Sequence, residues 1–501
     1  MPLIVKPPVE EVKKAFADNK GNLHPVYVDM PADLLTPVAT YLKISKLRPN
    51  TFIFESVAGG EKLSRYSFIG ADPYKVIRSG PGREHSGDPL KFVEEEMKGI
   101  RHIKLPDIPA FTGGAIGFVA FDCIEYFEPR TKMDLKNGLG IPESVLMFMD
   151  TILVFDHLRQ RLQVITHIRL PEGGEGGKAL QEEIHSRYHA AQSLLHSLVA
   201  TLASDHTPLP SQPPIGKGSE PISNVGQDGY QGFVRSLKSH IVDGDIIQAV
   251  PSQRLALPTK LHPFNAYRHL RGMNPSPYMF YVDLGDFQLV GASPEMLVKV
   301  ENGTVYTHPI AGTRKRGKTP EEDEALAQEL LSDIKERSEH VMLVDLGRND
   351  VNRICDPETV EVSSLMHIER YSHVMHIVSN VSGKLRPECT PLDAFRSIFP
   401  AGTVSGAPKV KACQIIRGLE GERRGVYAGS VGHFDYSGDL DTCIAIRTMV
   451  FKDGIAYLQA GGGIVHDSEE VAEWEETMNK LGSSVAAIRN AEAHFREDTG
   501  A

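Results

Sequence analysis

Two acidic stretches of the chain carry carboxylates at a spacing that places them on one face of a helix. Glu336 and Glu339 are three residues apart in KERSEHVMLVDLGRND, and Glu473 and Glu476 have the same spacing in EVAEWEETMNK. Like carboxylates on one face repel each other unless a proton or a cation lies between them, and oxygen-only ligands of this kind suit Mg²⁺. A solvated acidic face is the alternative, and it is the more common outcome for either stretch taken alone.

Three further charged or titratable residues could take part in chemistry at such a site. Arg447 stands in TCIAIRTMV, an otherwise apolar and β-branched run that predicts a strand, and a guanidinium there needs an anion or carbonyl partner. That partner can be a structural salt bridge or a substrate carboxylate. His376 stands in HVMHIVS, where it is either a core histidine or a proton donor. Lys480 follows Glu476 by four residues, on the same helix face.

Glycine clusters mark two places where backbone can approach a ligand closely. They are FPAGTVSGAPK, with Gly402 and Gly406, and AGGGIVHD, with Gly461, Gly462 and Gly463. Neither cluster matches a nucleotide-binding pattern. No GxSxG or GxCxG word is present, so the chain shows no hydrolase or glutaminase nucleophile.

Strands and helices must position these residues, and they follow one another in an uneven order. TFIFES, TILVFDH, LQVITHI and FQLVGAS predict strands, and 178–202 predicts a helix. A further helix follows Thr319, which can cap it with Glu322 completing a capping box, and a terminal helix follows Asp467 as cap. This order predicts an α+β fold with substantial antiparallel sheet, not a regular βαβ alternation.

The length of 501 residues exceeds what one ordinary hydrophobic core accommodates. Residues 203–227 are rich in proline, glycine and serine and predict a linker or long loop. We therefore expect an N-terminal region at 1–202, a C-terminal region at 228–490 and a tail at 491–501. The shorter stretch PEGGEGG at 171–177 predicts a flexible turn.

The net charge of -11 disfavours nucleic acid or an anionic membrane as the main partner, because both need a positive protein surface. No apolar run of about 18 residues is present to span a bilayer, and the N-terminus lacks the pattern of a signal peptide. The five cysteines are odd in number and include no CxxC pair, which favours a reducing compartment. We expect a cytoplasmic protein.

Six long sequence motifs, taken together, identify a protein family more specifically than any single residue does. In order, they are HPIAGTRKRG, ERSEHVMLVDLGRNDVNRIC, RYSHVMHIVSNVSGKL, FPAGTVSGAPKVKA, GDLDTCIAIRT and QAGGGIVHDSEEVAEWEETMNK. The chain resembles the chorismate-utilising enzyme family over most of 228–490, and FIFESVAGGEKLSRYSFIG extends the match into the N-terminal region. The resemblance implies a large antiparallel β-sandwich core flanked by helices.

The resemblance also implies an activity with a cofactor and a partner. Mg²⁺-dependent amination of chorismate at C2 by ammonia, followed by elimination of pyruvate, would give anthranilate, the first step towards tryptophan. A separate glutamine amidotransferase subunit would supply the ammonia in a hetero-oligomer, and tryptophan would be a feedback inhibitor.

Each matching position takes an implied role. Glu339 and Glu476 would bind Mg²⁺, with Glu336 and Glu473 assisting through water. His376 would be the general acid that protonates the departing 4-hydroxyl. Gln248 and Thr403 complete the catalytic positions; Gly312, Thr313, Tyr427, Arg447, Gly461, Gly462, Gly463 and Lys480 would bind substrate; Ser56, Pro277, Tyr278 and Met279 would bind tryptophan.

Two positions discriminate between members of the family. Gln248 stands where relatives that add water to chorismate carry a lysine base, which argues against an isochorismate or salicylate synthase. Ala311 stands where aminodeoxychorismate synthases carry a lysine nucleophile. A catalytically silent tryptophan-binding regulator is a third alternative, and it would be expected to have lost charged pocket residues that this chain keeps.

Overall fold

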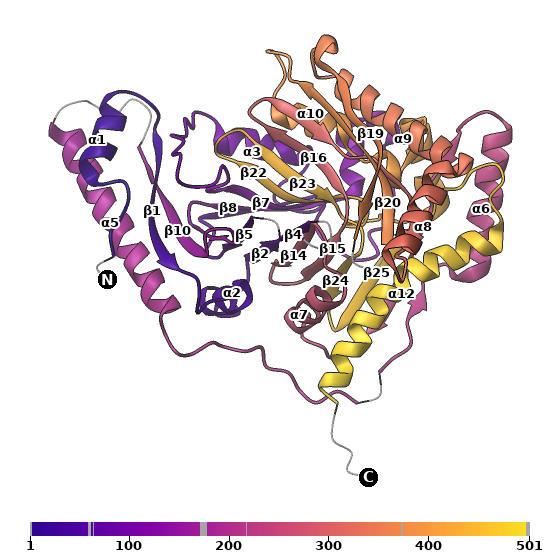
Figure 1. Cartoon of the computed structure of the whole chain (residues 1–501), viewed down its shortest axis with the longest axis horizontal. Coiled ribbons are helices and arrows are strands. Elements are labelled where there is room, and N and C mark those ends of the chain that lie inside the picture. The colour runs from indigo at the N-terminus through magenta and orange to yellow at the C-terminus, as the bar shows by residue number, and fades with distance from the viewer. Residues whose placement is uncertain are drawn as a thin grey trace.

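Runs of β-branched and aromatic residues form two large sheets that pack face to face (Figure 1). The computed structural model describes residues 3–58, 62–63, 65–170, 178–216, 218–371 and 374–496. The stretch 171–177 that predicts a flexible turn lies outside these ranges, as do residues 497–501 of the expected tail.

The first sheet has eleven strands and the second has ten. The first runs in the order β1 (Leu23–Pro31), β10 (Arg161–Arg169), β9 (Ile152–Asp156), β5 (Tyr66–Gly70), β2 (Thr51–Glu55), β14 (Tyr278–Asp283), β15 (Gln288–Ser293), β24 (Thr448–Lys452), β25 (Ile455–Gly461), β13 (Ser252–Pro258) and β11 (Ile222–Ser223). The second runs in the order β18 (Ile310–Lys315), β20 (Val374–Lys384), β17 (Thr304–Thr307), β16 (Met296–Glu301), β23 (Leu440–Ile444), β22 (Ser430–Asp435), β7 (Gly114–Val119), β8 (Ser144–Met149) and β6 (Lys75–Ser79), with β19 (Glu361–Arg370) paired to β20. Two short pairs join β12 (Gln248–Ala249) to β21 (Gly406–Ala407) and β3 (Val57–Ala58) to β4 (Lys62–Leu63).

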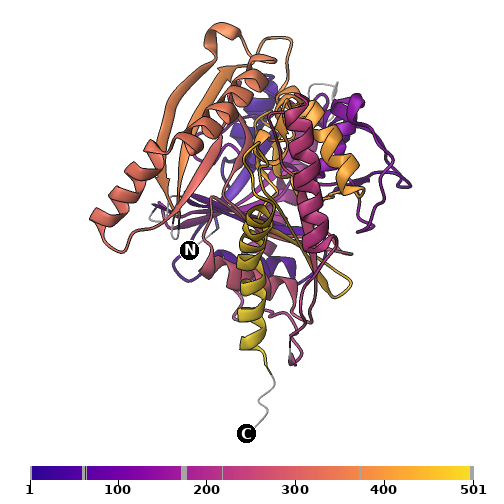
Figure 2. The same ribbon diagram turned by 90° about the vertical axis from the view of Figure 1, so that its right-hand side faces the viewer.

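Helices flank the sheets, as Figures 1 and 2 show. They are α1 (Val9–Ala17), α2 (Pro37–Ser45), α3 (Pro89–Met97), α4 (Ile124–Phe127), α5 (Lys178–Leu202), α6 (Gly226–Val242), α7 (Pro263–Met273), α8 (Pro320–Ser332), α9 (Ile334–Asn352), α10 (Pro391–Ile398), α11 (Lys409–Glu420) and α12 (Glu470–His494). Short 3₁₀ turns lie at Phe121–Cys123, Pro129–Thr131, Pro357–Thr359 and Gly402–Val404. The expected β-sandwich flanked by helices is confirmed. Among the described residues, none of the helices combines the length and apolarity needed to cross a membrane.

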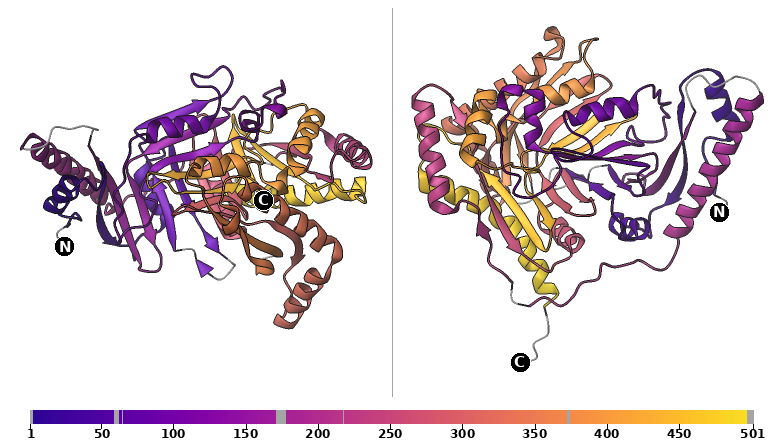
Figure 3. Two further views of the ribbon diagram at one scale, coloured as in Figure 1. Left: turned by 90° about the horizontal axis from the view of Figure 1, so that it is seen from above. Right: turned by 180° about the vertical axis from the view of Figure 1, so that it is seen from behind.

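Strands from both sides of the 203–227 segment enter both sheets. In the first sheet β2 pairs antiparallel with β14, and in the second β7 pairs antiparallel with β22. The segment itself runs as an extended stretch along one edge of the molecule, clearest in the rear view (Figure 3). Gln212 anchors it, because its Oε1 accepts a hydrogen bond from the backbone nitrogen of His262 at 2.8 Å. The segment therefore connects two parts of one shared sandwich.

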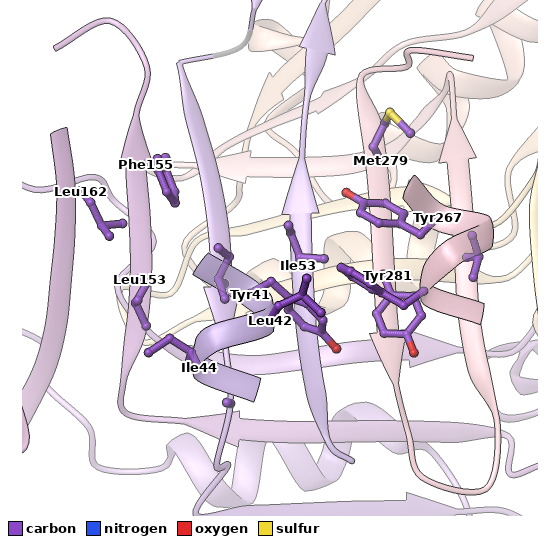
Figure 4. Close-up of a cluster of buried hydrophobic side chains, with 14 of the residues drawn as sticks. Tyr41, Leu42, Ile44, Ile53, Leu153, Phe155, Leu162, Tyr267, Met279 and Tyr281 are labelled. Carbon is purple, nitrogen blue, oxygen red and sulfur yellow. The ribbon is translucent and has the colours of Figure 1, made fainter. Parts of the chain in front are cut away.

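Alternation along the strands divides the core into layers. In β2, Phe52 packs between the two sheets, whereas Ile53 faces the opposite side of its sheet, where α2 lies. In β14, Phe280 and Tyr281 divide in the same way. Figure 4 shows the helix-covered layer, with side chains of α2 and α7 packed over β2, β9 and β14.

Three local expectations differ from the structure. TCIAIRTMV is not one strand: β23 ends at Ile444 in one sheet, β24 begins at Thr448 in the other, and Arg447 turns the chain between them with φ 51°. Asp467 does not cap α12, whose N-cap is Glu469 without a side-chain cap, and the helix extends to His494 into the expected tail. Thr319 caps α8 as expected, but the Glu322 carboxylate accepts from Lys318 nitrogen instead of closing a capping box with Thr319.

Candidate active site

A cavity of about 780 Å³ opens where the two sheets, α9 and α12 meet. Fourteen of the fifteen residues expected to bind metal or substrate or to act in catalysis line it: Gln248, Gly312, Thr313, Glu336, Glu339, His376, Thr403, Tyr427, Arg447, Gly461, Gly463, Glu473, Glu476 and Lys480. Gly462 lies just behind the wall, where its backbone nitrogen donates to the Tyr230 hydroxyl at 3.2 Å. Residues that are far apart in the sequence are thus brought to one cavity.

The two acidic helices face the glycine run. A Cβ added to Gly462 would lie 3.2 Å from a carboxylate oxygen of Glu473 and 3.9 Å from one of Glu476, and a Cβ added to Gly463 would lie 3.5 Å from Glu339. Glycine therefore leaves the space into which carboxylates of both helices point. The pKa of Glu339 is raised mainly by burial, with Glu336 and Glu476 as nearby negative charges. Burial likewise raises the pKa of Glu473.

Neighbouring side chains hold these carboxylates in place. The Gln248 Nε2 donates to Glu339 Oε1 at 3.0 Å, Lys480 pairs with Glu476 at 2.7 Å, and Glu336 is bound by Arg314 at 3.0 Å. The Glu336 carboxylate is thereby turned partly towards a protein cation. Gln248 is 2 % exposed, and its Oε1 has no hydrogen-bond partner among the residues that the structure describes, which leaves one buried acceptor at the cavity wall.

Arg447 reaches the cavity from the turn between the sheets. Its Nη1 donates to the backbone oxygen of Lys480 at 3.1 Å and lies 3.4 Å from the Ser483 hydroxyl. Within the described ranges no carboxylate pairs with its guanidinium, so the structural salt bridge left open by the sequence is not formed. Arg447 is open to solvent within the cavity, yet the protein around it lowers its pKa by desolvation. An unpaired cation of this kind suits a carboxylate ligand.

Tyr427 completes the wall beside Arg447. Its hydroxyl lies against Gly461, where a Cβ would come within 3.0 Å of it. Burial raises the pKa of Tyr427 to about 12, so its hydroxyl remains a hydrogen-bond donor at neutral pH. On the other side of Gly461, Lys480 Nζ donates to the backbone oxygen at 2.9 Å.

His376 lies on β20 with its ring fixed by β18. Its Nδ1 is 2.8 Å from the backbone oxygen of Gly312 and 3.1 Å from the Thr313 hydroxyl. Because a carbonyl oxygen only accepts, Nδ1 carries the hydrogen and the neutral ring has its lone pair on Nε2. Burial lowers the pKa of His376. The neutral ring is therefore favoured.

Glu295 is a residue of this cavity that the sequence analysis missed. It is 6 % exposed, and its Oε1 accepts a hydrogen bond from the Thr403 hydroxyl at 2.8 Å. Burial raises the pKa of Glu295 to about 8, so the carboxyl holds a proton at neutral pH. The available signal was a single acid two residues after the buried strand FQLVGAS, which marks a carboxyl close to the core.

A second cavity of about 530 Å³ lies between the sheets near β2 and β14. All four positions expected to bind an effector line it: Ser56, Pro277, Tyr278 and Met279. Its wall combines aromatic rings, among them Phe54, with charged side chains such as Asp441, to which the Tyr278 hydroxyl donates at 2.9 Å. Pro294 and Ile310 line both this cavity and the active-site cavity.

Comparison with known proteins assigns the chain to a family. A family model described as chorismate binding enzyme matches residues 49–486. Probable anthranilate synthase component 1 of Schizosaccharomyces pombe is 52% identical over 495 residues, covering 99% of each chain. Anthranilate synthase component 1 of Saccharomyces cerevisiae is 51% identical over 508 residues, covering 99% of this chain and 98% of that protein. This chain belongs to the chorismate binding enzyme family.

Solved structures support the same assignment. Anthranilate synthase component I from Streptococcus pneumoniae TIGR4 superposes with a TM-score of 0.70 at 36% identity, covering 91% of this chain and 98% of that one. The menaquinone-specific isochorismate synthase from Escherichia coli superposes with a TM-score of 0.68, covering 96% of this chain and 98% of that one. At 18% identity, the second likeness concerns the fold alone.

Proposed function

We propose that this protein is the chorismate-aminating component of an anthranilate synthase. It would add ammonia to C2 of chorismate and then eliminate pyruvate. The observation that carries the proposal is a single cavity in which Arg447, without a carboxylate partner among the described residues, lies beside Tyr427 and faces a group of carboxylates. Two positions of the same cavity that hold a lysine in other family members are Gln248 and Ala311 here, and neither side chain can act as a base or a nucleophile. Full-length identity of about half to proteins named anthranilate synthase component 1 supports it.

We propose Mg²⁺ as the cofactor, held by Glu339 and Glu476 with Glu473 and Glu336 nearby. The donor set fits: carboxylates of two helices point into one space, and burial together with mutual repulsion raises the pKa of Glu339. Mg²⁺ usually keeps several waters and binds through one or two carboxylates together with substrate oxygens, so two glutamates on facing helices are a sufficient protein donor set. When bound, the ion would supply positive charge for the ring carboxylate of chorismate.

The enolpyruvyl carboxylate would bind Arg447 and the Tyr427 hydroxyl, which fixes the ring in the cavity. Ammonia attacks C2, the ring double bonds shift, and the bond from C4 to its hydroxyl breaks. The leaving hydroxyl needs a proton, and the raised pKa of Glu295 suits this carboxyl to supply it alongside His376. Gln248 Oε1 is an acceptor that can bind an N–H of the attacking ammonia.

The second step removes the hydrogen at C2 and breaks the bond from C3 to the enolpyruvyl oxygen, which releases pyruvate and leaves an aromatic ring. His376 is suited to take this proton, because Nδ1 is bound to Gly312 and Nε2 keeps a lone pair. The sequence assigned His376 the proton donated in the first step. The opposite pKa shifts of Glu295 and His376 favour sharing the two proton transfers between them.

We further propose that ammonia comes from a separate glutamine amidotransferase subunit in a hetero-oligomer. The chain lacks a glutaminase nucleophile word, and its relatives carry the name component 1. We also propose that tryptophan binds the 530 Å³ cavity as a feedback inhibitor. Aromatic side chains there suit an indole, and the polar groups around Ser56 and Asp441 suit an amino acid backbone.

The test is turnover of chorismate by the purified chain with Mg²⁺ and an ammonium salt at alkaline pH. We expect a fluorescent product, loss of activity with a chelator, and recovery on adding Mg²⁺. Formation of isochorismate, or no turnover while a control enzyme is active on the same substrate, would contradict the proposal. Turnover that persists unchanged with the chelator would remove Mg²⁺ from it.

A further inference from the structure

A buried ion pair lies directly behind the active-site wall without touching the cavity. Arg424 is 2 % exposed, and its Nε and Nη2 donate to the two carboxylate oxygens of Glu420, the last residue of α11, at 2.8 and 2.7 Å. Neither side chain lines the cavity. The pair is bidentate, which fixes the plane of the guanidinium.

The rest of the guanidinium binds three segments that do line the cavity. Nη1 donates to the backbone oxygen of Val404 at 2.9 Å and Nη2 to that of Val250 at 2.6 Å. The guanidinium carbon also lies 5.5 Å from the ring centroid of Tyr427. Val404 follows Thr403, the partner of Glu295, and Tyr427 stands beside Arg447. One side chain therefore joins three segments of the cavity wall.

Glu420 extends the same connection to the glycine run. Its Oε1 accepts from the backbone nitrogen and the hydroxyl of Ser252 at 2.8 and 2.9 Å. Ser252 is paired with Gly461 across β13 and β25, and its hydroxyl also receives a hydrogen bond from Gln459 in the cavity wall. The backbone of Gly461, which contacts Lys480 and Tyr427, is thus connected through Ser252 to the same ion pair.

We infer that Arg424 and Glu420 are positioning residues for the part of the site that binds the enolpyruvyl carboxylate, an inference that rests on the proposed function. A buried ion pair contributes little net stability, because the desolvation of both charges offsets their attraction. What this pair supplies is geometry: a planar fork serves Glu420, Val250 and Val404 at once. A lysine ammonium at the same place cannot reach all three acceptors.

The chain offers a matched control on α11, the helix that ends at Glu420. Arg417 is 1 % exposed and pairs with Asp122 and Glu125 at 3.3 and 3.0 Å, so it is also a buried arginine in an ion pair. Neither it nor its two partners line the cavity. Arg417→Lys therefore reproduces the loss of a buried arginine in an ion pair that has no direct contact with the cavity wall.

The experiment compares Arg424→Lys with Arg417→Lys in the full chain. Thermal unfolding, kcat and KM for chorismate with Mg²⁺ and ammonium, and calorimetric binding of chorismate with Mg²⁺ are measured for each. We expect Arg424→Lys to lower kcat/KM on the order of ten- to a hundredfold, mostly through KM, since small displacements of binding groups cost this much. Arg417→Lys should lower the unfolding temperature while kcat/KM stays close to wild type.

A double-mutant cycle with Tyr427→Phe measures whether the effects of the two substitutions on kcat/KM are coupled. A residue that only stabilises the fold would show no such coupling. Removing the hydroxyl should cost less in the Arg424→Lys background than in wild type, because its position is already lost. Additive losses, or equal effects of Arg424→Lys and Arg417→Lys on chorismate binding, would overturn the inference. Should Arg424→Lys not fold, Glu420→Gln, which keeps the arginine and one acceptor oxygen, takes its place with the same expected rise in KM.

Turnover by wild type tests the proposed function, whereas chorismate binding by Arg424→Lys tests the role of Arg424. A wild-type chain that binds chorismate without turning it over refutes the proposed chemistry, and the calorimetry still tests Arg424. A wild-type chain that forms anthranilate while Arg424→Lys binds chorismate normally refutes only the inference.

Discussion

Replacing Glu295 by glutamine tests the assignment of a proton donor that sequence reasoning did not find. Glutamine keeps the shape and an acceptor oxygen for the Thr403 hydroxyl, but it has no carboxyl proton to give. A positioned general acid contributes about 10²- to 10⁴-fold to a rate, so kcat should fall by that range. The control is Thr403→Ser, which retains a hydroxyl that can donate to Glu295, and its kcat should fall far less than that of Glu295→Gln.

The pH dependence gives the sign of the effect. Burial raises the pKa of Glu295 from 4.5 to about 8, so the active, protonated form is present below pH 8 and is lost as pH rises through that value. The rate of wild type, followed by anthranilate fluorescence at a constant concentration of free ammonia, should therefore decline above pH 8. The residual rate of Glu295→Gln should lack this decline. An unchanged kcat in the variant, or a wild-type rate that rises steadily through pH 8, would refute the reasoning.

The same group affects stability. Between pH 4.5 and about 8 the carboxyl is protonated in the folded chain and ionised in the unfolded chain, so the free energy of unfolding falls as pH rises. At 1.36 kcal/mol per pKa unit, the full difference is on the order of 5 kcal/mol. Glu295→Gln removes this loss, so its stability relative to wild type should increase from pH 5 to pH 8, as urea unfolding would measure. A constant difference across that range would argue against a buried, neutral carboxyl.

Two further predictions concern the metal and the effector. Glu476→Gln should lower turnover on the order of 10²-fold or more in a folded protein, because a ligand of the proposed ion loses its charge. The control is Glu475→Gln, which changes the neighbouring residue outside the cavity. Equal activity of the two variants would remove Glu476 from the metal site. Ser56→Arg should place a large charged side chain in the 530 Å³ cavity and raise the tryptophan concentration for half inhibition about ten- to a hundredfold, which corresponds to a loss of about 1.4 to 2.8 kcal/mol of binding free energy. Inhibition curves that superpose on those of wild type would contradict this placement of the effector.

The sequence pattern predicted an α+β fold with antiparallel sheet, the family resemblance implied the sandwich, and the matched positions lie together at one cavity. Long identifying words such as QAGGGIVHDSEEVAEWEETMNK carry their own local geometry, since helical spacing puts Glu473 and Glu476 on one face. The run TFIFES predicted a strand, and β2 runs over Thr51–Glu55. These features depend on residues close together in the chain.

Features that depend on distant contacts were not predictable in the same way. The apolar run around Arg447 has no local break, yet the chain changes sheets there, because β23 and β24 have different strand neighbours. Glu295 gives no periodic signal, and its role follows only from the burial that the fold imposes and from Thr403, more than a hundred positions away. The division at 203–227 is visible in composition, whereas the sharing of both sheets across it is a property of the pairing between β2 and β14 and between β7 and β22.

The position at which nitrogen enters the ring distinguishes amination at C2 from the other reactions of chorismate. Chorismate is incubated with the chain, Mg²⁺ and ¹⁵N-labelled ammonium, and the product is identified by NMR and mass spectrometry. We expect pyruvate and 2-aminobenzoate carrying one ¹⁵N. Labelled 4-aminobenzoate, or unlabelled isochorismate or salicylate, would contradict it.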